Sequence, residues 1–400
     1  MAATGSASPT LGISVRRFLV PDLPTAEELI PYLRRIDEAR WYSNFGPLVR
    51  ELEDELRRIL TKADSSSTED RIYLTTLVSG YHALEVALRL VGIKPGKKVL
   101  VPAVTFAACP LAVQHAGGEA ILSDIDPVTW TLTPEIARAV ASRVQVDAVM
   151  PVALYGVPIP VSPWEAFTRE TGIAVVIDAA AAMEVQQIPK MGLVAHSLHA
   201  TKPFGVGEGG VLACRNPDLI EKARQYTNFG TSERICQTNG SNAKMSEYHA
   251  AVGCAQANRW GEIKRRRRDL LKLYEYYLAP HAESLSLQPA VETSVVSLFV
   301  LFLRRPIAET VLHELSSRGV ATHRSYLPPL HRHPNFAMLA ISSVEGKVLT
   351  AETPAARRHG HMTHSENLMS HLIGVPFHSF MSESDVISIV NELNRHLQVS

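Results

Sequence analysis

The sequence predicts an α/β fold in which helices cover a mostly parallel central sheet, with a smaller α+β unit following it. Short apolar segments alternate with segments of helical periodicity through the middle of the chain, which is the pattern of a parallel sheet. These apolar segments lack polar alternation, as expected for strands buried on both faces. With 400 residues, of which 46% are hydrophobic and 20% charged, the chain can bury more than one core.

The first elements follow one another closely. Apolar residues recur at helical spacing over residues 81–91, and the turn-forming pair Pro95-Gly96 separates this helix from an apolar strand. The alternation continues to a strand that ends just before Asp178, and ligands of parallel sheets bind beyond such strand ends. Helices are predicted over 81–91, 107–115 and 164–171, and strands over 99–101, 120–122, 147–152 and 173–177.

The second half of the chain contains longer helices. Small residues such as Ala250 and Gly253 suit the helix over 246–260 to close packing, and a further helix over 263–278 is expected to bridge to a second unit. Ser382 is expected to cap the last helix. Strands are predicted over 211–214 and 295–303, helices over 219–226, 308–318 and 383–397, and loops over 65–68 and 342–364. We expect a flexible tail (1–20), a large domain (21–270) and a small domain (271–400).

Charge and composition argue against several classes of partner. Lysine plus arginine equals aspartate plus glutamate, at 40 each, so no net field attracts nucleic acid or an anionic membrane. Flanking acids favour a solvated helix face for the arginine cluster at 265–268.

The sequence contains no apolar run of about 18 residues, so we expect no membrane span, and the N-terminal segment lacks an apolar signal core. We expect a cytoplasmic protein with reduced thiols at Cys109, Cys214, Cys236 and Cys254.

The residues around Lys202 favour one chemistry. Lys202 lies in Ser197-Leu-His-Ala-Thr-Lys-Pro-Phe-Gly-Val-Gly-Glu-Gly-Gly210, whose glycines let backbone approach a ligand closely and whose serine offers a hydroxyl to a phosphate. A lysine amine can form a Schiff base with an aldehyde cofactor. A carboxylate at a strand end, such as Asp178, can hold a pyridinium nitrogen. Together these residues predict a pyridoxal phosphate site.

Two alternative interpretations apply to the same residues. The glycines at 205–210 also match the GxGxxG pattern of dinucleotide-binding proteins, but that pattern follows a buried strand and opens a helix, whereas a strand follows it here. We therefore favour pyridoxal phosphate over a nicotinamide cofactor. Asp178 alone is equally suited to cap a helix. The presence of Lys202 downstream favours a partner for the pyridine nitrogen.

Motifs along the chain resemble, in order, those of the DegT/StrS-type sugar aminotransferases, which are fold type I pyridoxal phosphate enzymes. The resemblance spans about residues 20–395 and rests on the combined order of the motifs. They are Asn44-Phe-Gly-Pro47, Ser79-Gly-Tyr-His-Ala83, Thr105-Phe106, Ser123-Asp-Ile-Asp126, Tyr155-Gly156, Asp178-Ala-Ala180, Ser197 to Lys202, Gly207-Glu-Gly-Gly210, Asn228-Phe-Gly230, Gly240-Ser-Asn-Ala-Lys-Met245 and Tyr326 to His331.

The resemblance implies an aminotransferase that acts on a nucleotide-linked ketosugar or a similar cyclic ketone, with glutamate as the amino donor. Lys202 would form the Schiff base and then move the proton between substrate and cofactor, which would alternate with pyridoxamine phosphate. Asp178 would pair with the pyridine nitrogen, and Phe106 would stack on the ring.

The resemblance also implies how the cofactor phosphate is bound. Gly80, the backbone of Tyr81 and the hydroxyl of Ser197 would hold it from the same chain. Asn242 or Lys244 would reach it from the neighbouring subunit. The chain would therefore form a homodimer with shared active sites.

Two positions depart from the family pattern. Ala181, at a position that contacts the cofactor, stands where family members have glutamine or histidine to bond the ring oxygen, and His199 is a candidate to replace that donor. Tyr81 stands where threonine or serine often contacts the phosphate. These departures keep open the alternative of a non-catalytic regulator of the same fold. A dehydratase of the same family is a second alternative. Lys202 argues against the dehydratase, because those enzymes often have histidine in its place.

Further residues are candidates for contact with the substrate. Tyr155, Arg324, Tyr326 and His331 match segments that come near the active site in the family. The run at 359–364 contains three histidines, which raises the possibility of a metal site, but we favour a solvated loop there.

Overall fold

The computed structural model describes residues 16–63, 71–350, 352 and 360–397. Most of the predicted N-terminal tail and the predicted loop over 65–68 lie outside the described residues. Within the tail, Arg16 forms an isolated parallel bridge with Val320, and its amide donates to the Gly319 carbonyl at 2.8 Å. The chain therefore meets the C-terminal part of the molecule from its first described residue.

A nine-stranded sheet forms the centre of the molecule, with strand order β1-β7-β6-β5-β4-β2-β3-β12-β13. The six neighbours from β6 to β12 pair in parallel, and antiparallel β7 lies between β6 and β1. The prediction of a mostly parallel sheet is confirmed. The strands are β1 (Tyr73–Leu77), β2 (Lys98–Pro102), β3 (Glu119–Ser123), β4 (Ala148–Val149), β5 (Ala174–Asp178), β6 (Leu193–Ser197), β7 (Gly210–Cys214), β12 (Ala340–Ser342) and β13 (Val348–Leu349).

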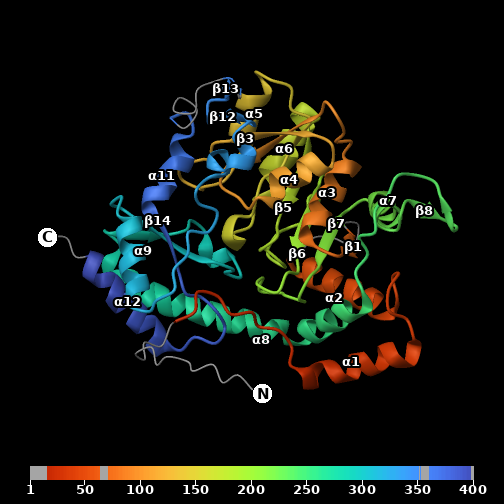
Figure 1. Cartoon of the computed structure of the whole chain (residues 1–400), viewed down its shortest axis with the longest axis horizontal. Helices are drawn as coiled ribbons and strands as arrows, with labels where there is room; N and C mark the ends of the chain where they lie inside the picture. The colour runs from red at the N-terminus through yellow and green to blue at the C-terminus, as the bar shows by residue number, and fades with distance from the viewer. Residues whose placement is uncertain (1–15, 64–70, 351, 353–359, 398–400) are drawn as a thin grey trace, which may run out of the picture.

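Helices cover both faces of this sheet (Figure 1). Successive residues of a strand point to opposite faces, so Val175 and Ile177 of β5 join one hydrophobic cluster while Val176 joins another. The second cluster includes residues of α3 (Gly80–Leu90), α4 (Ala108–His115) and α7 (Pro217–Thr227). The first includes residues of α1 (Ala26–Ala39), α2 (Pro47–Ala63), α5 (Pro134–Ala141) and α6 (Val161–Thr171). Both faces are therefore buried, as the continuous apolar strands predict.

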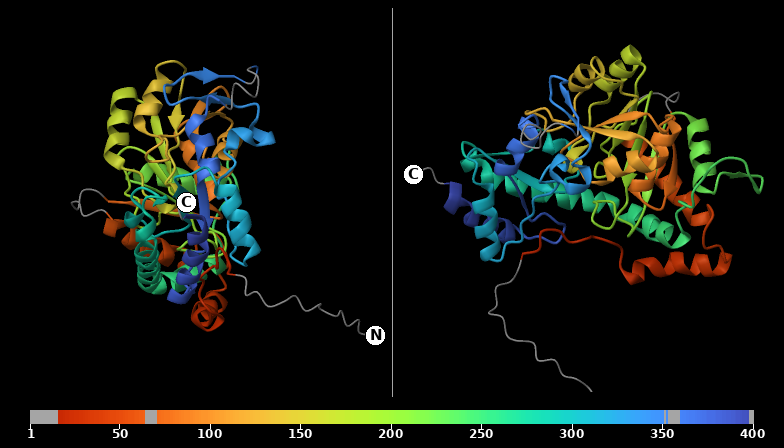
Figure 2. Two further views of the ribbon diagram at one scale, coloured as in Figure 1. Left: turned by 90° about the vertical axis from the view of Figure 1, so that its left-hand side faces the viewer. Right: turned by 45° about the horizontal axis from the view of Figure 1, so that its top comes forward.

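A single helix, α8 (Glu247–Leu278), runs along the molecule beneath the sheet and reaches the C-terminal elements (Figures 1 and 2). The prediction of two helices, with a break between 260 and 263, was wrong. A Cβ at Gly261 would meet no atom within 4 Å, so this glycine lies at an open position and does not interrupt the helix. At its first turn, Glu247 accepts hydrogen bonds from the amides of Leu48 and Val49 and so caps α2.

A separate hydrophobic cluster consists of residues between 270 and 397. The elements β12 and β13, which come from the same part of the chain, instead join the large sheet. Ser382 accepts a hydrogen bond from the amide of Asp385, in agreement with the predicted cap. The elements here are β10 (Leu285–Leu287), β11 (Phe299–Leu303), α9 (Ala308–Ser317), α11 (Thr363–His371), β14 (Leu372–Val375) and α12 (Glu383–Leu397).

Three further expectations need correction. The predicted strand over 147–152 is reduced to β4, with Val152 making only an isolated bridge to Asp178. The predicted loop over 342–364 contains β13 and the start of α11, while residues 353–359 lie outside the described part. In the arginine cluster, Arg267 is only 3% exposed, and burial lowers its pKa to about 10. Its guanidinium donates to the Val296 carbonyl at 2.7 Å, which compensates part of the desolvation.

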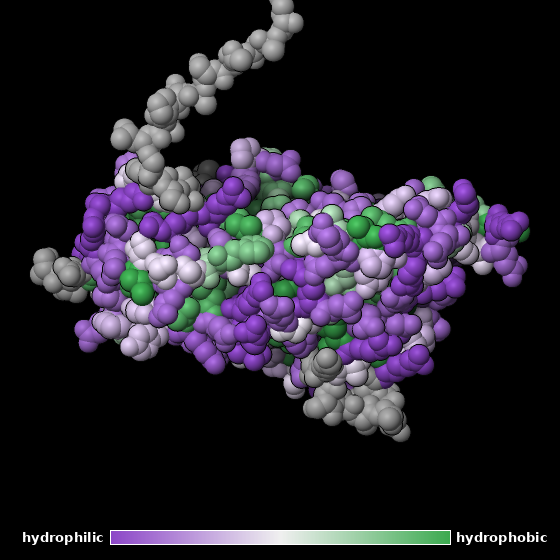
Figure 3. Space-filling view, turned by 90° about the horizontal axis from the view of Figure 1, so that it is seen from below, coloured by the Kyte–Doolittle hydropathy of each residue, from purple (hydrophilic) through white to green (hydrophobic). Residues whose placement is uncertain are grey.

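The lower face of the molecule is mostly hydrophilic, with small apolar patches between the polar residues (Figure 3). Among exposed apolar side chains, Ile30 and Leu33 lie on α1, and Trp41 and Tyr42 lie between α1 and α2. In the part of the chain that the structure describes, no helix combines the length and the apolar character needed to cross a membrane. The described cysteines are all free, and Cys236 alone among them is exposed.

Candidate active site

A cavity of about 690 Å³ lies at the carboxyl end of β5. One wall comes from the loops that follow the strands of the large sheet, and the other from segments 297–298 and 323–333. Most of the residues predicted to contact cofactor or substrate line this cavity. They are Gly80, Tyr81, Phe106, Tyr155, Asp178, Ala181, Ser197, Lys202, Arg324 and Tyr326.

Asp178 is the last residue of β5 and is buried at the floor of the cavity. Its Oδ1 accepts a hydrogen bond from the amide of Ala180 at 2.9 Å, and its Oδ2 accepts one from the thiol of Cys109 at 3.0 Å. Burial raises the pKa of Asp178, while these two hydrogen bonds and the charge of Lys202 oppose the shift. A buried carboxylate that faces a cavity in this way is suited to a cationic ligand atom.

Lys202 lies in a tight turn between β6 and β7. Its amide donates to the His199 carbonyl at 2.9 Å, and the Ala200 amide donates to the Gly207 carbonyl at 2.8 Å. These backbone bonds fix the turn, so the lysine side chain extends from a rigid base into the cavity. Lys202 and Asp178 thus converge from neighbouring parallel strands, β6 and β5, on one space.

The end of the cavity at α3 has the properties of an anion site. Ser79 caps α3, so Gly80 and Tyr81 form the first turn, whose amides are free of helical hydrogen bonds. Ser197 lies beside them, because a Cβ on Gly80 would come within 2.8 Å of the Ser197 Cβ. Gly210 is equally confined, since its Cβ would lie 2.2 Å from the Ser79 carbonyl oxygen. This cradle of amides and a hydroxyl fits a phosphate group.

The Tyr81 side chain does not take part in this cradle. Its hydroxyl lies 2.5 Å from Nδ1 of His115 on α4, and its ring packs against that imidazole. Only the backbone of Tyr81 is left for an anion, in agreement with the predicted departure from the family pattern.

The middle of the cavity accommodates a flat ring. Phe106 is 63% exposed beside the cavity, an unusual state for a phenylalanine, and a bound aromatic ring would cover it. Ala181, which also lines the cavity, offers no side-chain hydrogen-bond donor. His199 also lines the cavity, with its Nδ1 bonded to the Thr201 hydroxyl at 2.8 Å. The anion cradle, the exposed ring, the lysine and the carboxylate together fit pyridoxal phosphate.

Aromatic rings form the wall on the substrate side. Tyr155 and Tyr326 stack with centroids 5.3 Å apart and planes at 3°. The Tyr155 hydroxyl donates to the Ser325 carbonyl at 2.9 Å, and burial raises its pKa well above the usual value. Arg324 lies in the same segment and donates to the Met369 carbonyl of α11. This wall is rigid and offers both an apolar surface and a cation.

Three predicted residues lie outside the cavity lining. His331 is 1% exposed at its side chain, and its Nε2 lies 2.6 Å from Glu366, so it points into the protein. His333, two residues later, lines the cavity instead. Asn242 and Lys244 lie beside β1, where Lys244 bridges to Leu77 and its amine donates to Asn242 at 2.9 Å.

Sequence reasoning missed several lining residues. Phe18 and Leu19 precede the first helix, and Ser297 and Leu298 precede β11. None of them belongs to a polar motif, so only the folded chain reveals their position. Cys109, the hydrogen-bond donor to Asp178, was predicted only to be a reduced thiol.

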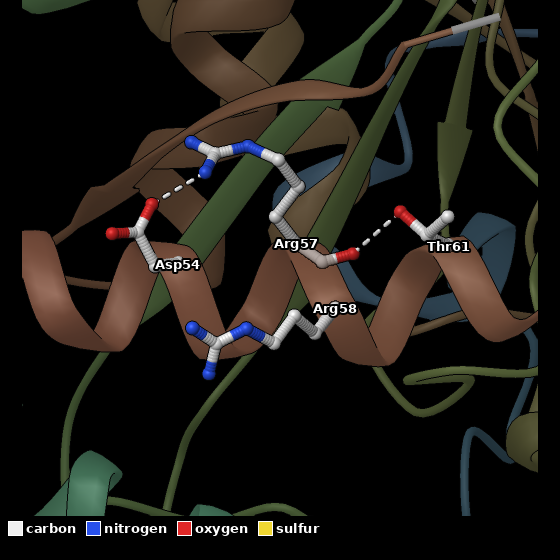
Figure 4. A pocket seen from close by; sticks show the side chains of 4 residues that line it. All are labelled: Asp54, Arg57, Arg58 and Thr61. Carbon is white, nitrogen blue, oxygen red and sulfur yellow. Dashed lines mark hydrogen bonds and ion pairs between the residues drawn. The ribbon is translucent and has the colours of Figure 1, made fainter. Parts of the chain in front are cut away.

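A second hollow lies on the outer side of α2 (Figure 4) and is lined by Asp54, Arg57, Arg58 and Thr61. Arg57 pairs with Asp54 at 2.5 Å, and the Thr61 hydroxyl donates to the Arg57 carbonyl at 2.7 Å. Arg58 pairs with Glu55, which also belongs to α2, so these contacts all lie along a single helix and we assign no chemistry to the hollow. Within the described ranges, no cluster of three or more histidine, cysteine or acidic side chains is suited to hold a metal ion.

Known proteins share this sequence pattern and fold. A profile of the DegT/DnrJ/EryC1/StrS aminotransferase family matches residues 24–394. Protein Rv3402c of Mycobacterium tuberculosis is 30% identical over 391 residues, covering 93% of this chain and 88% of that protein. The dTDP-4-amino-4,6-dideoxy-D-glucose transaminase of Shigella dysenteriae is 32% identical over 268 residues, covering 64% of this chain and 69% of the transaminase. A crystal structure described as a PLP-dependent aminotransferase from Bacillus cereus has a TM-score of 0.81 and 26% identity, covering 94% of this chain and 99% of that one.

Proposed function

The chain belongs to the DegT/DnrJ/EryC1/StrS aminotransferase family, and from this premise we propose that it transfers an amino group from glutamate to a keto group of a nucleotide-linked sugar or a similar cyclic substrate. Membership makes the chain a sugar aminotransferase that depends on pyridoxal phosphate. The glutamate donor, the nucleotide and the roles of individual residues are parts of the proposal.

One observation carries the proposal: Lys202 and Asp178 line the same cavity, with the anion cradle of Gly80 and Ser197 at one end. Pyridoxal phosphate has three groups that need separate partners, namely an aldehyde, a ring nitrogen and a phosphate. The cavity offers an amine, a carboxylate and a set of amides and hydroxyls for them. A surface lysine of other function would not need this combination.

The chemistry divides between the cofactor and the protein. When bound, pyridoxal phosphate supplies a carbonyl that links covalently to amines and a ring that withdraws electrons from the adjacent carbon. Asp178 would hold negative charge against the ring nitrogen and so favour a proton on that nitrogen. Phe106 would hold the ring by stacking. Lys202 would supply the amine that binds the cofactor aldehyde and that moves a proton at the substrate carbon.

The substrate side of the cavity supports a sugar or a similar ring as acceptor. The partly exposed ring of Tyr326, which stacks on the buried ring of Tyr155, offers an apolar surface that suits the face of a sugar ring. Arg324 and His333 add donors for hydroxyl or phosphate oxygens. The Shigella relative is named for a dTDP-linked amino sugar, which supports a nucleotide-linked acceptor here.

We also propose a homodimer in which the partner's copy completes the phosphate site. Exposed aromatic side chains at Trp41, Tyr42 and Tyr248 support a contact surface near the start of α8. Burial lowers the pKa of Lys244, and its ammonium lies 4.7 Å from the centre of the Phe229 ring. Lys244 thus lies in a compact cluster beside β1 that a second chain can use.

Absorbance and turnover test the proposal. Purified protein with added pyridoxal phosphate should show a band at roughly 410–430 nm, the region of lysine-bound cofactor. Lys202→Ala should lose this band and all amination, whereas Lys222→Ala, which removes an exposed lysine of α7, should keep both. The protein loaded with pyridoxamine phosphate should regain the band when a nucleotide ketosugar from a panel accepts the amino group. Amination that survives in Lys202→Ala would refute the assignment.

A further inference from the structure

A buried thiol lies directly behind the carboxylate of Asp178. The Sγ of Cys109 lies 3.0 Å from Asp178 Oδ2, and the hydroxyl of Thr105 lies 3.2 Å from the same sulfur. Cys109 belongs to α4 and Asp178 ends β5, so folding brings together residues that are far apart in the sequence. Cys109 has no exposed surface and does not line the cavity, so it can act on the chemistry only through neighbours such as Asp178 and Thr105, which do line it.

The direction of the hydrogen bond follows from the surroundings of the thiol. Burial and the neighbouring carboxylate raise the pKa of Cys109 well above its ordinary value, so the sulfur keeps its proton. The S–H therefore donates to Asp178 Oδ2, and the Thr105 hydroxyl can donate to the sulfur in turn. Because the Ala180 amide holds Oδ1 at 2.9 Å, the carboxylate has a donor on each oxygen and its plane is fixed.

We propose that Cys109 is a positioning residue whose S–H keeps Asp178 ionised and oriented toward the cavity, and so determines how firmly the protein holds the cofactor's ring nitrogen. This inference rests on the proposed role of Asp178. Loss of the S–H would leave Oδ2 without its protein donor at a buried position, which disfavours the ionised carboxylate.

The competing explanation is that Cys109 only fills space, as buried cysteines commonly do. Cys214 offers a comparison, because it is also buried and donates its S–H to a backbone carbonyl, that of Asn216, at 3.2 Å. A space-filling role predicts that alanine and serine at position 109 differ little in cofactor binding. A donor role predicts that serine, which keeps a proton donor, preserves binding and alanine does not.

The first experiment examines the thiol in the full-length, cofactor-free protein by infrared spectroscopy. The S–H stretching band of Cys109 is isolated as the difference between wild type and Cys109→Ser. In Asp178→Asn this band should move to higher frequency, because an amide oxygen is a weaker acceptor than a carboxylate. A band that does not move would overturn the inference. Since no cofactor is present, this result does not depend on whether the proposed function is correct.

The second experiment measures the dissociation constant of pyridoxal phosphate. Cys109→Ala should weaken binding by about fivefold, since a hydrogen bond to a charged group is lost and the thiol is a weak donor. Cys109→Ser should stay within about twofold of wild type, and the control Cys214→Ala should be unchanged. In turnover, Cys109→Ala should lower kcat and leave the KM of the ketosugar unchanged. Equal binding by Cys109→Ala and wild type would refute the positioning role, whereas a wild type that binds no pyridoxal phosphate would refute the proposed function.

Discussion

A buried histidine should make the stability of this protein sensitive to acid. His196 on β6 has no exposed surface, and its Nδ1 lies 3.1 Å from the Ala179 carbonyl, to which it donates. Within the described part of the chain, its Nε2 is buried and has no hydrogen-bond partner. Protonation would place a charge and an unpaired N–H in the core, so burial lowers the pKa of His196 to about 4.

The size of this effect on the free energy of unfolding follows from the pKa of His196 in the unfolded and in the folded protein. In the unfolded chain His196 takes up a proton below its ordinary value of 6.5, but in the folded protein only below about 4. Between these values the unfolded state binds one more proton, so the free energy of unfolding falls as the pH falls. The contribution of neutral His196 to the free energy of unfolding is complete above about pH 6.5 and is lost progressively down to about pH 4. The difference between its two pKa values corresponds to about 3 kcal/mol.

His196→Asn tests this value, because asparagine keeps a donor for the Ala179 carbonyl and cannot be protonated. At neutral pH the variant should be less stable, since the smaller side chain leaves a void. Between pH 6.5 and 4 its free energy of unfolding should fall by about 3 kcal/mol less than that of wild type. Urea unfolding followed by circular dichroism at fixed protein concentration measures both. His313→Asn, which changes an exposed histidine of α9, is the control. Parallel curves for wild type and His196→Asn would refute the reasoning.

Two further substitutions have expected outcomes. Gly80→Ala should weaken pyridoxal phosphate binding by about tenfold, because the new Cβ would lie 2.8 Å from the Ser197 Cβ and 2.9 Å from its Cα. Unchanged binding in equilibrium titration would contradict the position of the anion cradle. Asp124→Asn should lower the free energy of unfolding by about 2 kcal/mol, because the buried carboxylate accepts bonds from the amides of His364 and Ser365 and so holds the start of α11. Denaturant unfolding measures the loss, and an equally stable variant would show that this anchor contributes little.

The side of the cavity that contains Lys202 and Asp178 was predictable, because short stretches of sequence determine its structure. Lys202 and Ser197 share one short motif, and Gly80 opens a helix whose start is marked by a capping serine. Asp178 follows an apolar strand, and the rule that parallel strands present ligands at their carboxyl ends placed it correctly. Each of these predictions needed only residues adjacent in the sequence.

Other features depend on contacts that the sequence does not display. The sequence predicted a substrate contact at His331, but a short 3-10 turn directs His331 to Glu366, and His333 lines the cavity instead. The contact between Cys109 and Asp178 joins two elements whose packing has no local signature. The short strand β13 exists because β12 extends the large sheet and offers it an edge.

The two walls of the cavity therefore come from different parts of the chain, one from the large sheet and the other from segments outside β1 to β7. The cofactor wall consists of strand ends and one helix start that belong to a single sheet, so its geometry is fixed by the core on both faces. The opposite wall consists of segments 18–19, 297–298 and 323–333, which come from outside the seven strands from β1 to β7. Substitutions in these segments can change the shape offered to a substrate while Lys202 and Asp178 stay in place. We therefore propose that residues of the second wall, such as Arg324 and His333, determine which substrate is accepted.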